Sequence, residues 1–182
     1  MAPHHVAEGM SMGVLTADMK KVITSEYGTC FVATVSADGK PNLSPKGTLE
    51  VLDDDHLVFC DIRSPNTRRN LEANPFIEIN VVDLLSRKGF RFKGRAQVIR
   101  DGDLYETVVR RLNAGAVDPP PPALVRNPDV PEGAYWVKSI IYVTVEWAAG
   151  ITAPIYDHGY DEETVRARWL ARRAQQEAQR GR

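Results

Sequence analysis

The sequence predicts a mainly β protein with short helices, built around a six-stranded antiparallel β-barrel. Six strands are predicted, at residues 29–36, 41–52, 56–62, 76–82, 89–99 and 134–148, and the first of them is rich in β-branched and aromatic residues. The turn at Asp38-Gly39 and the acidic turn at 53–55 join the first three into a meander, which is antiparallel by construction. Six strands can hardly leave both sheet edges open, so we expect closure into a small barrel.

Four helices are predicted around these strands, at residues 16–27, 64–73, 101–112 and 161–180. Thr16 can cap the first helix, in which apolar residues recur at helical spacing. Ser64 and Pro65 are favoured at the start of the second helix, and the helix is expected to stop before Pro75. The fourth is a charged C-terminal helix.

The strand predicted at 89–99 has the clearest alternation of apolar and polar residues. One face is expected to carry Phe90, Phe92, Ala96 and Val98. The other is expected to carry Arg91, Lys93, Arg95 and Gln97. Gly94 interrupts the strand, as a β-bulge or a tight barrel bend would.

Length and composition fit one globular domain. The chain has 182 residues, of which 43% are hydrophobic and 26% charged. A net charge of −1 argues against a nucleic-acid partner, and no apolar run approaches the ~18 residues that cross a bilayer. We expect a disordered tail at 1–13, one domain at 14–160 and the charged helix within 161–182. We also expect a polyproline loop around 119–122 and, with no signal-peptide pattern, a cytoplasmic location.

The cysteines and histidines give little evidence of a reactive or metal site. Cys30 and Cys60 lie in apolar strand segments and are expected to be buried free thiols, although a disulfide between them is the alternative. No His/Cys spacing typical of zinc is present, so no metal site is predicted. His158 is flanked by an acidic residue and two tyrosines in an expected surface loop.

The first candidate binding site is the turn Ser64-Pro65-Asn66-Thr67-Arg68-Arg69. A helix N-terminus presents unpaired N–H groups and partial positive charge, which attract anions. The short polar side chains add hydrogen-bonding groups, and the two arginines can bind a phosphate bidentately. The alternative is an ordinary capped helix with two solvated arginines.

The second candidate is the strand segment Asn42-Leu43-Ser44-Pro45-Lys46-Gly47-Thr48. Proline and glycine weaken strand pairing, so such a segment often faces a ligand with its backbone. Lys46 could meet the same anion as the helix; the alternative is an irregular edge strand with an exposed lysine. No GxGxxG, P-loop, GxSxG or HExxH motif is present.

The order of these elements resembles that of the FMN-binding split-barrel proteins related to pyridoxamine 5′-phosphate oxidase. The resemblance covers about residues 17–112 and rests on Asp38-Gly39-Lys40-Pro41, on Leu57-Val58-Phe59-Cys60-Asp61 and on Ser64 through Leu71-Glu72-Ala73-Asn74-Pro75. It implies a six-stranded split barrel and a homodimer with flavin held at the subunit interface.

The resemblance, together with the anion-binding turn, implies a set of cofactor-binding positions. They are Ser44, Pro45, Lys46, Gly47, Thr48, Cys60, Asp61, Ser64, Asn66, Thr67 and Arg68. Two departures stand out. Asn66 and Thr67 stand where the oxidase has an Arg-Lys pair on the FMN phosphate, and Gly89 stands where it has a glutamine. Arg68, Lys46 and the helix N-terminus could supply the missing charge.

We therefore expect an FMN-dependent oxidoreductase that transfers hydride or electrons between flavin and a nicotinamide or another small molecule. The segment Trp147-Ala148-Ala149-Gly150 and the residues after it lack the Trp- and Arg-containing pattern that binds substrate phosphate in the oxidase. Pyridoxamine 5′-phosphate is therefore not the expected substrate. An F420-dependent reductase and a non-catalytic flavin- or heme-binding protein remain alternatives. Apolar strand faces at Ile140, Tyr142 and Val143 also favour a homodimer.

Overall fold

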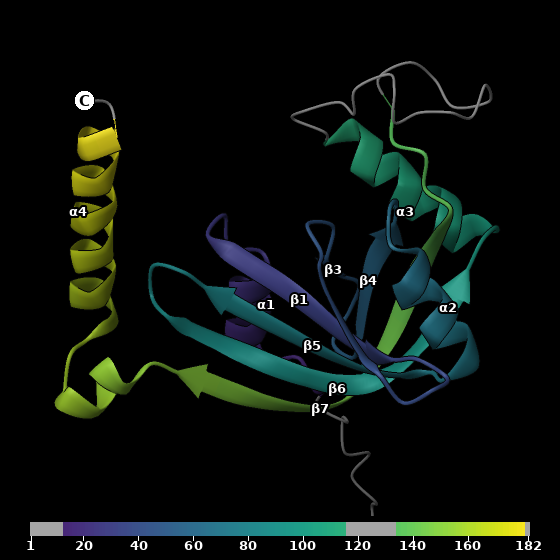
Figure 1. Ribbon diagram of the computed structural model, residues 1–182, viewed down its shortest axis with the longest axis horizontal. Helices are drawn as coiled ribbons and strands as arrows, with labels where there is room; N and C mark the ends of the chain where they lie inside the picture. The colour runs from purple at the N-terminus through teal and green to yellow at the C-terminus, as the bar shows by residue number, and fades with distance from the viewer. Residues whose placement is uncertain (1–12, 116–133, 181–182) are drawn as a thin grey trace, which may run out of the picture.

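A computed structural model describes residues 13–115 and 134–180 of the protein (Figure 1). The strands are β1 (Gly28–Val35), β2 (Pro41–Pro45), β3 (Glu50–Val51), β4 (His56–Asp61), β5 (Phe76–Asp83), β6 (Lys88–Ile99) and β7 (Ser139–Thr152). The helices are α1 (Ala17–Ile23), α2 (Pro65–Ala73), α3 (Asp103–Ala114), the 3₁₀ helix η2 (Pro154–His158) and α4 (Glu162–Arg180). The expected N-terminal tail, apart from Gly13, and the polyproline segment lie outside the described residues.

The strands form one antiparallel sheet in the order β2-β1-β5-β6-β7-β4-β3. The mainly β class with short helices is confirmed, but the predicted number of six strands is wrong, because the sheet has seven. The single strand predicted at 41–52 is two strands, since β2 pairs with β1 whereas β3 pairs with β4 at the opposite edge. Pro45, which has no N–H to donate, is the last residue of β2.

The expected closure of the sheet is not complete, because the edge strands β2 and β3 do not pair with each other and the sheet is open; only a short crossing of the chain links its two edges. Residues 46–49 run from one edge of the sheet to the other. The N–H of Lys46 donates to the carbonyl of Cys30 in β1 (3.0 Å), and the hydroxyl of Thr48 accepts from the N–H of Cys60 in β4 (2.9 Å). The barrel is therefore split between β2 and β3, and residues 46–48 bridge the split.

Two hydrophobic clusters lie on opposite sides of the sheet around β4 and β7. The larger one fills the inside of the curved sheet, where α1 packs against residues such as Val32, Phe59 and Phe92. The smaller one joins β4 and β7 to α3. Both sides of β7 are therefore covered, and Ile140 (0% exposed) and Val143 (1%) are core residues. The expectation that these two form an uncovered apolar face is wrong.

Local signals in the sequence were accurate at several element boundaries. The hydroxyl of Thr16 accepts from the N–H of Met19 at the start of α1, as its capping role predicts. Helix α2 begins at Pro65 and ends at Ala73 as predicted, but the Ser64 side chain makes no capping bond to the helix. Along β6, inward and outward positions alternate as expected. Its register shifts between Lys93 and Gly94, which confirms an irregularity at the glycine.

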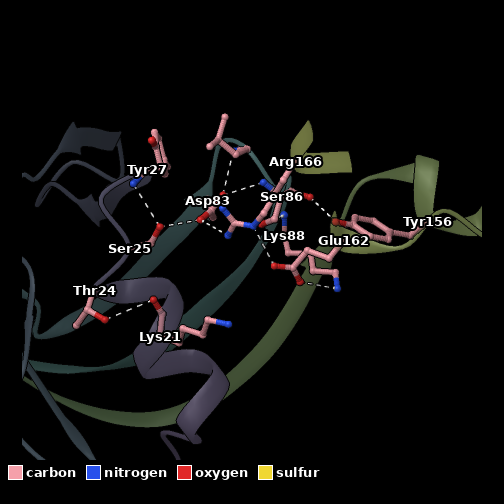
Figure 2. Close-up of polar contacts among 11 residues, drawn as sticks. Lys21, Thr24, Ser25, Tyr27, Asp83, Ser86, Lys88, Tyr156, Glu162 and Arg166 are labelled. Atoms are coloured by element: carbon pink, nitrogen blue, oxygen red, sulfur yellow. Dashed lines mark hydrogen bonds and ion pairs between the residues drawn. The ribbon is translucent and has the colours of Figure 1, made fainter. Parts of the chain in front are cut away.

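Asp83, at the end of β5, ties three parts of the chain together (Figure 2). Its carboxylate is 1% exposed and accepts from the N–H groups of Leu85 and Ser86, from the Ser25 hydroxyl and from the Arg166 guanidinium. Burial opposes its ionisation, but these hydrogen bonds and the charge of Arg166 outweigh that effect and lower the pKa of Asp83 to about 2. The β5–β6 turn, the segment after α1 and the root of α4 are thereby held together.

Helix α4 extends away from the sheet beyond the end of β7, at the opposite end from α2 and α3 (Figure 1). Its root is fixed by the fully buried Val165 and by the ion pairs of Arg166 with Asp83 and Glu162. Positions 171–180 are exposed throughout. None of the helices in the described parts of the chain combines the length and apolar character needed to cross a membrane.

The glycine at the β6 irregularity is predicted to be required for folding. A Cβ atom at Gly94 would overlap the carbonyl oxygen of Thr144 in β7, so Gly94→Ala should lower the free energy of unfolding by about 3 kcal/mol or more. Gly47→Ala is the matched control, because a Cβ atom there meets open space; its effect should stay within about 0.5 kcal/mol. Urea denaturation measures both, and equal effects would contradict the assignment.

Asp83→Asn should destabilise the protein in a pH-dependent way. At neutral pH we expect a loss of about 2 kcal/mol, because the charge-assisted bond to Arg166 is weakened. The folded-state pKa lies below the ordinary value of 3.8, so the carboxylate stabilises the fold fully above about pH 4 and progressively less as the pH falls toward about 2. The difference between wild type and variant should therefore shrink at pH 3, with exposed Asp157→Asn as the control. A constant difference across this range would refute the role of the charge.

Candidate functional site

The split in the barrel buries Lys46, a residue expected to face a ligand or solvent. Lys46 is only 8% exposed, and its ammonium donates to the Ser44 hydroxyl (2.6 Å) and lies 5.8 Å from the centre of the Phe59 ring. Burial lowers the pKa of Lys46, while the nearby charge of Asp61 opposes that change. The alternative of an exposed edge lysine is therefore wrong, and a cation lies inside the split.

Asp61 provides the negative charge next to this cation. It is the last residue of β4, is 1% exposed and pairs across the sheet with Ser139. One carboxylate oxygen, Oδ1, accepts from both the N–H (2.9 Å) and the hydroxyl (3.0 Å) of Ser64. Ser64 thus donates to the end of β4, which fixes the turn into α2 and explains why it does not cap the helix.

Arg68 approaches the other oxygen of the same carboxylate. Its Nε lies 3.3 Å from Asp61 Oδ2, and its side chain is 29% exposed. The two atoms form an ion pair without hydrogen-bond alignment, so both are buried atoms that lack a hydrogen-bond partner, as is the hydroxyl oxygen of Ser139. Three polar atoms with unfilled hydrogen-bonding capacity therefore gather at the start of α2.

Asn66 and Thr67, which stand at the positions of the oxidase Arg-Lys pair, point in different directions. Thr67 is 2% exposed, and its hydroxyl accepts from the side-chain amide of Asn42 (3.3 Å). Asn42 and Asn70 also donate to the hydroxyl of buried Thr34, so this network seats α2 on β1 and β2. Asn66 is exposed and accepts from Arg69 (3.2 Å).

A cavity of about 520 Å³ lies on the outer side of α2, against the β1–β2 turn. Asn66 and Arg69 line it together with Asp38 and Lys40 of the turn. The anion-binding segment therefore presents two arginines to two places: Arg68 to the split and Arg69 to this outer cavity.

The remaining predicted positions are structural or open. Cys60 and Cys30 are free, buried thiols, as expected. Burial raises the pKa of each to about 12, so neither is a thiolate nucleophile at neutral pH. The Cys60 side chain packs in the cluster under α3. Pro45 and Gly47 are exposed at the split, and Thr48 is held by its bond to the Cys60 N–H.

The structure thus brings together five of the predicted positions: Ser44, Lys46, Asp61, Ser64 and Arg68. Sequence reasoning included Asn42 in the second candidate segment but missed Thr34, Asn70 and Ser139, which carry the rest of the polar network and the third unpaired atom. No motif marks these residues, because each acquires its partner from another element. Gly89 is a tightly packed strand residue, where a Cβ atom would overlap the backbone of Val81.

The charge balance defines what this arrangement can bind. Two cations face one carboxylate, so the cluster carries a net positive charge next to the N-terminus of α2. An oxyanion is attracted to such a place, and arginine is suited to hold it. Asp61 weakens that attraction, because part of the charge on Arg68 is already compensated.

Comparisons with known proteins agree with the fold and place the chain among its relatives. Residues 15–132 match the family described as pyridoxamine 5′-phosphate oxidase. The uncharacterised protein MJ0282 of Methanocaldococcus jannaschii is 28% identical over 102 residues, which are 55% of this chain and 66% of that protein. The match thus spans just under two thirds of that relative.

Several solved structures are similar, and three of them illustrate the range of similarity. The tagged HupZ protein of Group A Streptococcus is 27% identical, with a TM-score of 0.61 over 76% of this chain and 94% of that one. An FMN-binding protein from Syntrophomonas wolfei subsp. wolfei is 15% identical, with a TM-score of 0.59 over 76% and 87% of the two chains. An F420 reductase is 20% identical, with a TM-score of 0.50 over 71% and 94%. The last two show a shared fold alone.

The family match extends from two residues before α1 past the end of α3 and so includes the split, the Lys46–Asp61–Arg68 cluster and both arginines of α2. Well over half of the chain is therefore covered, and the chain belongs to the pyridoxamine 5′-phosphate oxidase family.

Proposed function

We propose that the protein binds FMN and acts as an FMN-dependent oxidoreductase, with a nicotinamide or another small organic molecule as its redox partner. The observation that carries this proposal is the net-positive cluster of Lys46, Asp61 and Arg68 in the split, beside the N-terminus of α2. The family assignment and the similarity to a solved FMN-binding protein support it.

The residues present fit a phosphate-bearing flavin. The side chain of Arg68 is 29% exposed, so the outer nitrogens of its guanidinium can donate to a ligand phosphate. The exposed backbone at Pro45 and Gly47 offers peptide groups to the edge of a planar ring. Bound FMN would supply the hydride or electron transfer itself.

The protein's own residues would bind and orient in this arrangement. Arg68 and the first N–H groups of α2 would hold the phosphate, and Ser64 would keep the turn in place through Asp61. Lys46 would keep a positive charge inside the split, where its bond to Ser44 fixes the direction of the ammonium. Residues 44–48 would line the ring with backbone, and no nucleophilic side chain is required.

We further propose a homodimer that uses the outer face of the sheet. One row of paired residues crosses five strands of the sheet and therefore lies on one face, the outer face. In the order β2, β1, β5, β6 and β7, this row consists of Leu43, Ala33, Glu78, Lys93 and Trp147. Large apolar side chains on this face are exposed: Phe31 (37%), Val35 (41%), Leu43 (68%), Phe76 (54%) and Trp147 (43%). A groove of about 500 Å³ runs between them. An apolar patch of this kind is typical of an interface between proteins.

F420 is the second candidate cofactor, because a solved F420 reductase shares the fold. The absorption spectrum of the protein as isolated separates oxidised flavin from the deazaflavin. Pyridoxamine 5′-phosphate is not the proposed substrate: the segment after β7 forms η2, which contains no arginine. Efficient formation of pyridoxal phosphate would contradict this point.

Arg68→Ala should weaken FMN binding by about 10- to 100-fold, since a charge-assisted contact contributes roughly 1.5–3 kcal/mol and each decade is about 1.4 kcal/mol. The loss includes exposure of the phosphate to uncompensated Asp61. Quenching of flavin fluorescence in titrations of apoprotein measures the affinity. Riboflavin, which has no phosphate, should bind wild type poorly and be nearly indifferent to the change.

Arg69→Ala is the comparison variant, because Arg69 faces the outer cavity of α2. We expect it to leave FMN affinity within about twofold. If Arg69→Ala weakens binding and Arg68→Ala does not, the phosphate lies on the outer side of α2. No saturable fluorescence change in the wild type at micromolar protein would refute flavin binding altogether.

Leu43→Asp should convert the proposed dimer to a monomer, because it would bury a charge in place of the most exposed apolar side chain of the outer face. Leu84→Asp is the matched control, since Leu84 is also highly exposed (54%) but lies in the β5–β6 turn. Sedimentation velocity at micromolar concentration distinguishes the two species. A monomeric wild type would contradict the proposal.

A further inference from the structure

A second cavity lies at the other end of the sheet from α2, between the β5–β6 turn, the end of β7 and α4. Its volume is about 520 Å³, which suits a small molecule. Its wall is mainly apolar and is formed by Val82, Leu85, Ile151, Ala153 and the ring of Trp169. A smaller cavity of about 220 Å³ adjoins it on the other side of Arg87 and Trp169.

Arginines surround this apolar wall. Arg87 and Arg173 line the larger cavity, and Arg168 and Arg172 line the smaller one. Arg87 and Arg172 each lie 5.1 Å from the centre of the Trp169 ring. The guanidinium groups are therefore held against an aromatic surface, which orients them while leaving their hydrogen-bond donors free.

None of these four arginines forms an ion pair with a carboxylate anywhere in residues 13–115 and 134–180. Two acids near the root of α4 are paired with other cations, because Asp83 and Glu162 bind Arg166 and Glu162 also binds Lys88 (Figure 2). Arg168 and Arg172 are four residues apart on one helix, a like-charge spacing that weakens a helix. The cluster thus carries an uncompensated positive charge.

The backbone also directs one of these arginines into place. Arg87 has a φ of 56°, and no other residue except glycine in the described parts of the chain has a positive φ. Its N–H donates to the carbonyl of Asp83 (2.8 Å), and its carbonyl accepts from Ala153 (3.2 Å). A left-handed conformation is uncommon outside glycine, so this turn holds Arg87 toward Trp169 at some cost.

We propose that this cavity, called here the Trp169 cavity, binds a small amphipathic organic anion: an apolar or aromatic body that carries a carboxylate or phosphate group. The apolar wall takes the body of the ligand, and Arg87 and Arg173 take its oxyanion. The site is separate from the split, because α4 and α2 stand at opposite ends of the sheet (Figure 1). It does not depend on whether the split binds flavin.

The test uses 8-anilinonaphthalene-1-sulfonate, a fluorescent aromatic anion, with the full-length protein. Arg87→Gln and Arg173→Gln should each weaken its binding by about tenfold, the effect of a lost charge-assisted contact. Arg180→Gln is the matched control, because it removes the same charge from an exposed position at the far end of α4. It should change the affinity by less than about twofold.

A neutral probe separates the charge from the apolar wall. N-phenyl-1-naphthylamine has a similar aromatic body without the sulfonate, so Arg173→Gln should leave its binding unchanged, whereas Trp169→Ala should weaken both probes. Competition by benzoate and by phenyl phosphate then identifies the preferred oxyanion.

Three results would overturn the proposal. The first is equal binding of the anionic probe to wild type and to both arginine variants. The second is an equal loss in Arg180→Gln, which would mean a diffuse electrostatic effect. The third is displacement of the probe by FMN with an affinity that Arg68→Ala weakens, which would place the probe in the flavin site of the split and not in the Trp169 cavity. Failure of FMN to bind at all would leave the proposal standing.

Discussion

The crossing of residues 46–49 is the constraint on which the rest of the structure depends. These residues must leave β2 at one edge of the sheet, span the split and reach β3 at the other edge. One hydrogen bond at each side fixes them there, from Lys46 to Cys30 of β1 and from Cys60 of β4 to Thr48. A chain that crosses so close to the core carries Lys46 inward, where its charge has lost most of its water. A buried ammonium is costly unless it is paired and hydrogen-bonded. Asp61 and Ser44 meet that requirement, and Asp61 in turn sets the position of Ser64 and the start of α2.

Much of the fold could be predicted because many of its boundaries are set by local chemistry. Pro65 starts α2, Thr16 caps α1, and Gly94 marks an irregularity in β6 whatever its neighbours are. The division of 41–52 into β2 and β3 could not be predicted, because it depends on which strand each half pairs with, and those partners are β1 and β4. Coverage of β7 on both sides likewise follows from where α3 packs.

The candidate site was predicted less well than the fold for a related reason. Sequence position shows that Asn66, Thr67 and Arg68 lie at the start of a helix, but it does not show which side of the helix faces the sheet. The rotation of α2 about its own axis places Thr67 against Asn42 and Arg68 against Asp61, and it leaves Asn66 exposed. The residues that complete the site, Thr34 and Ser139, belong to strands far away in sequence. The Asp83–Arg166 pair joins positions 83 residues apart and has no local signature.

Both ends of the sheet therefore concentrate arginine, but they treat its charge differently. At α2 the fold places the buried carboxylate of Asp61 against Arg68, so an anion that binds there must compete with Asp61. Asp61 thus lowers the affinity for the anion while it holds the Arg68 side chain in one position. At α4 the carboxylates of Asp83 and Glu162 bind Arg166 and Lys88, which anchor the helix. In the described parts of the chain Arg87, Arg168, Arg172 and Arg173 have no ion-pair partner. Protein stability explains the first arrangement, because Asp61 is needed for the buried Lys46. It does not explain the second, in which like charges lie together around an apolar cavity. An arrangement that weakens a helix and strains a turn is best explained by a ligand that supplies the missing negative charge.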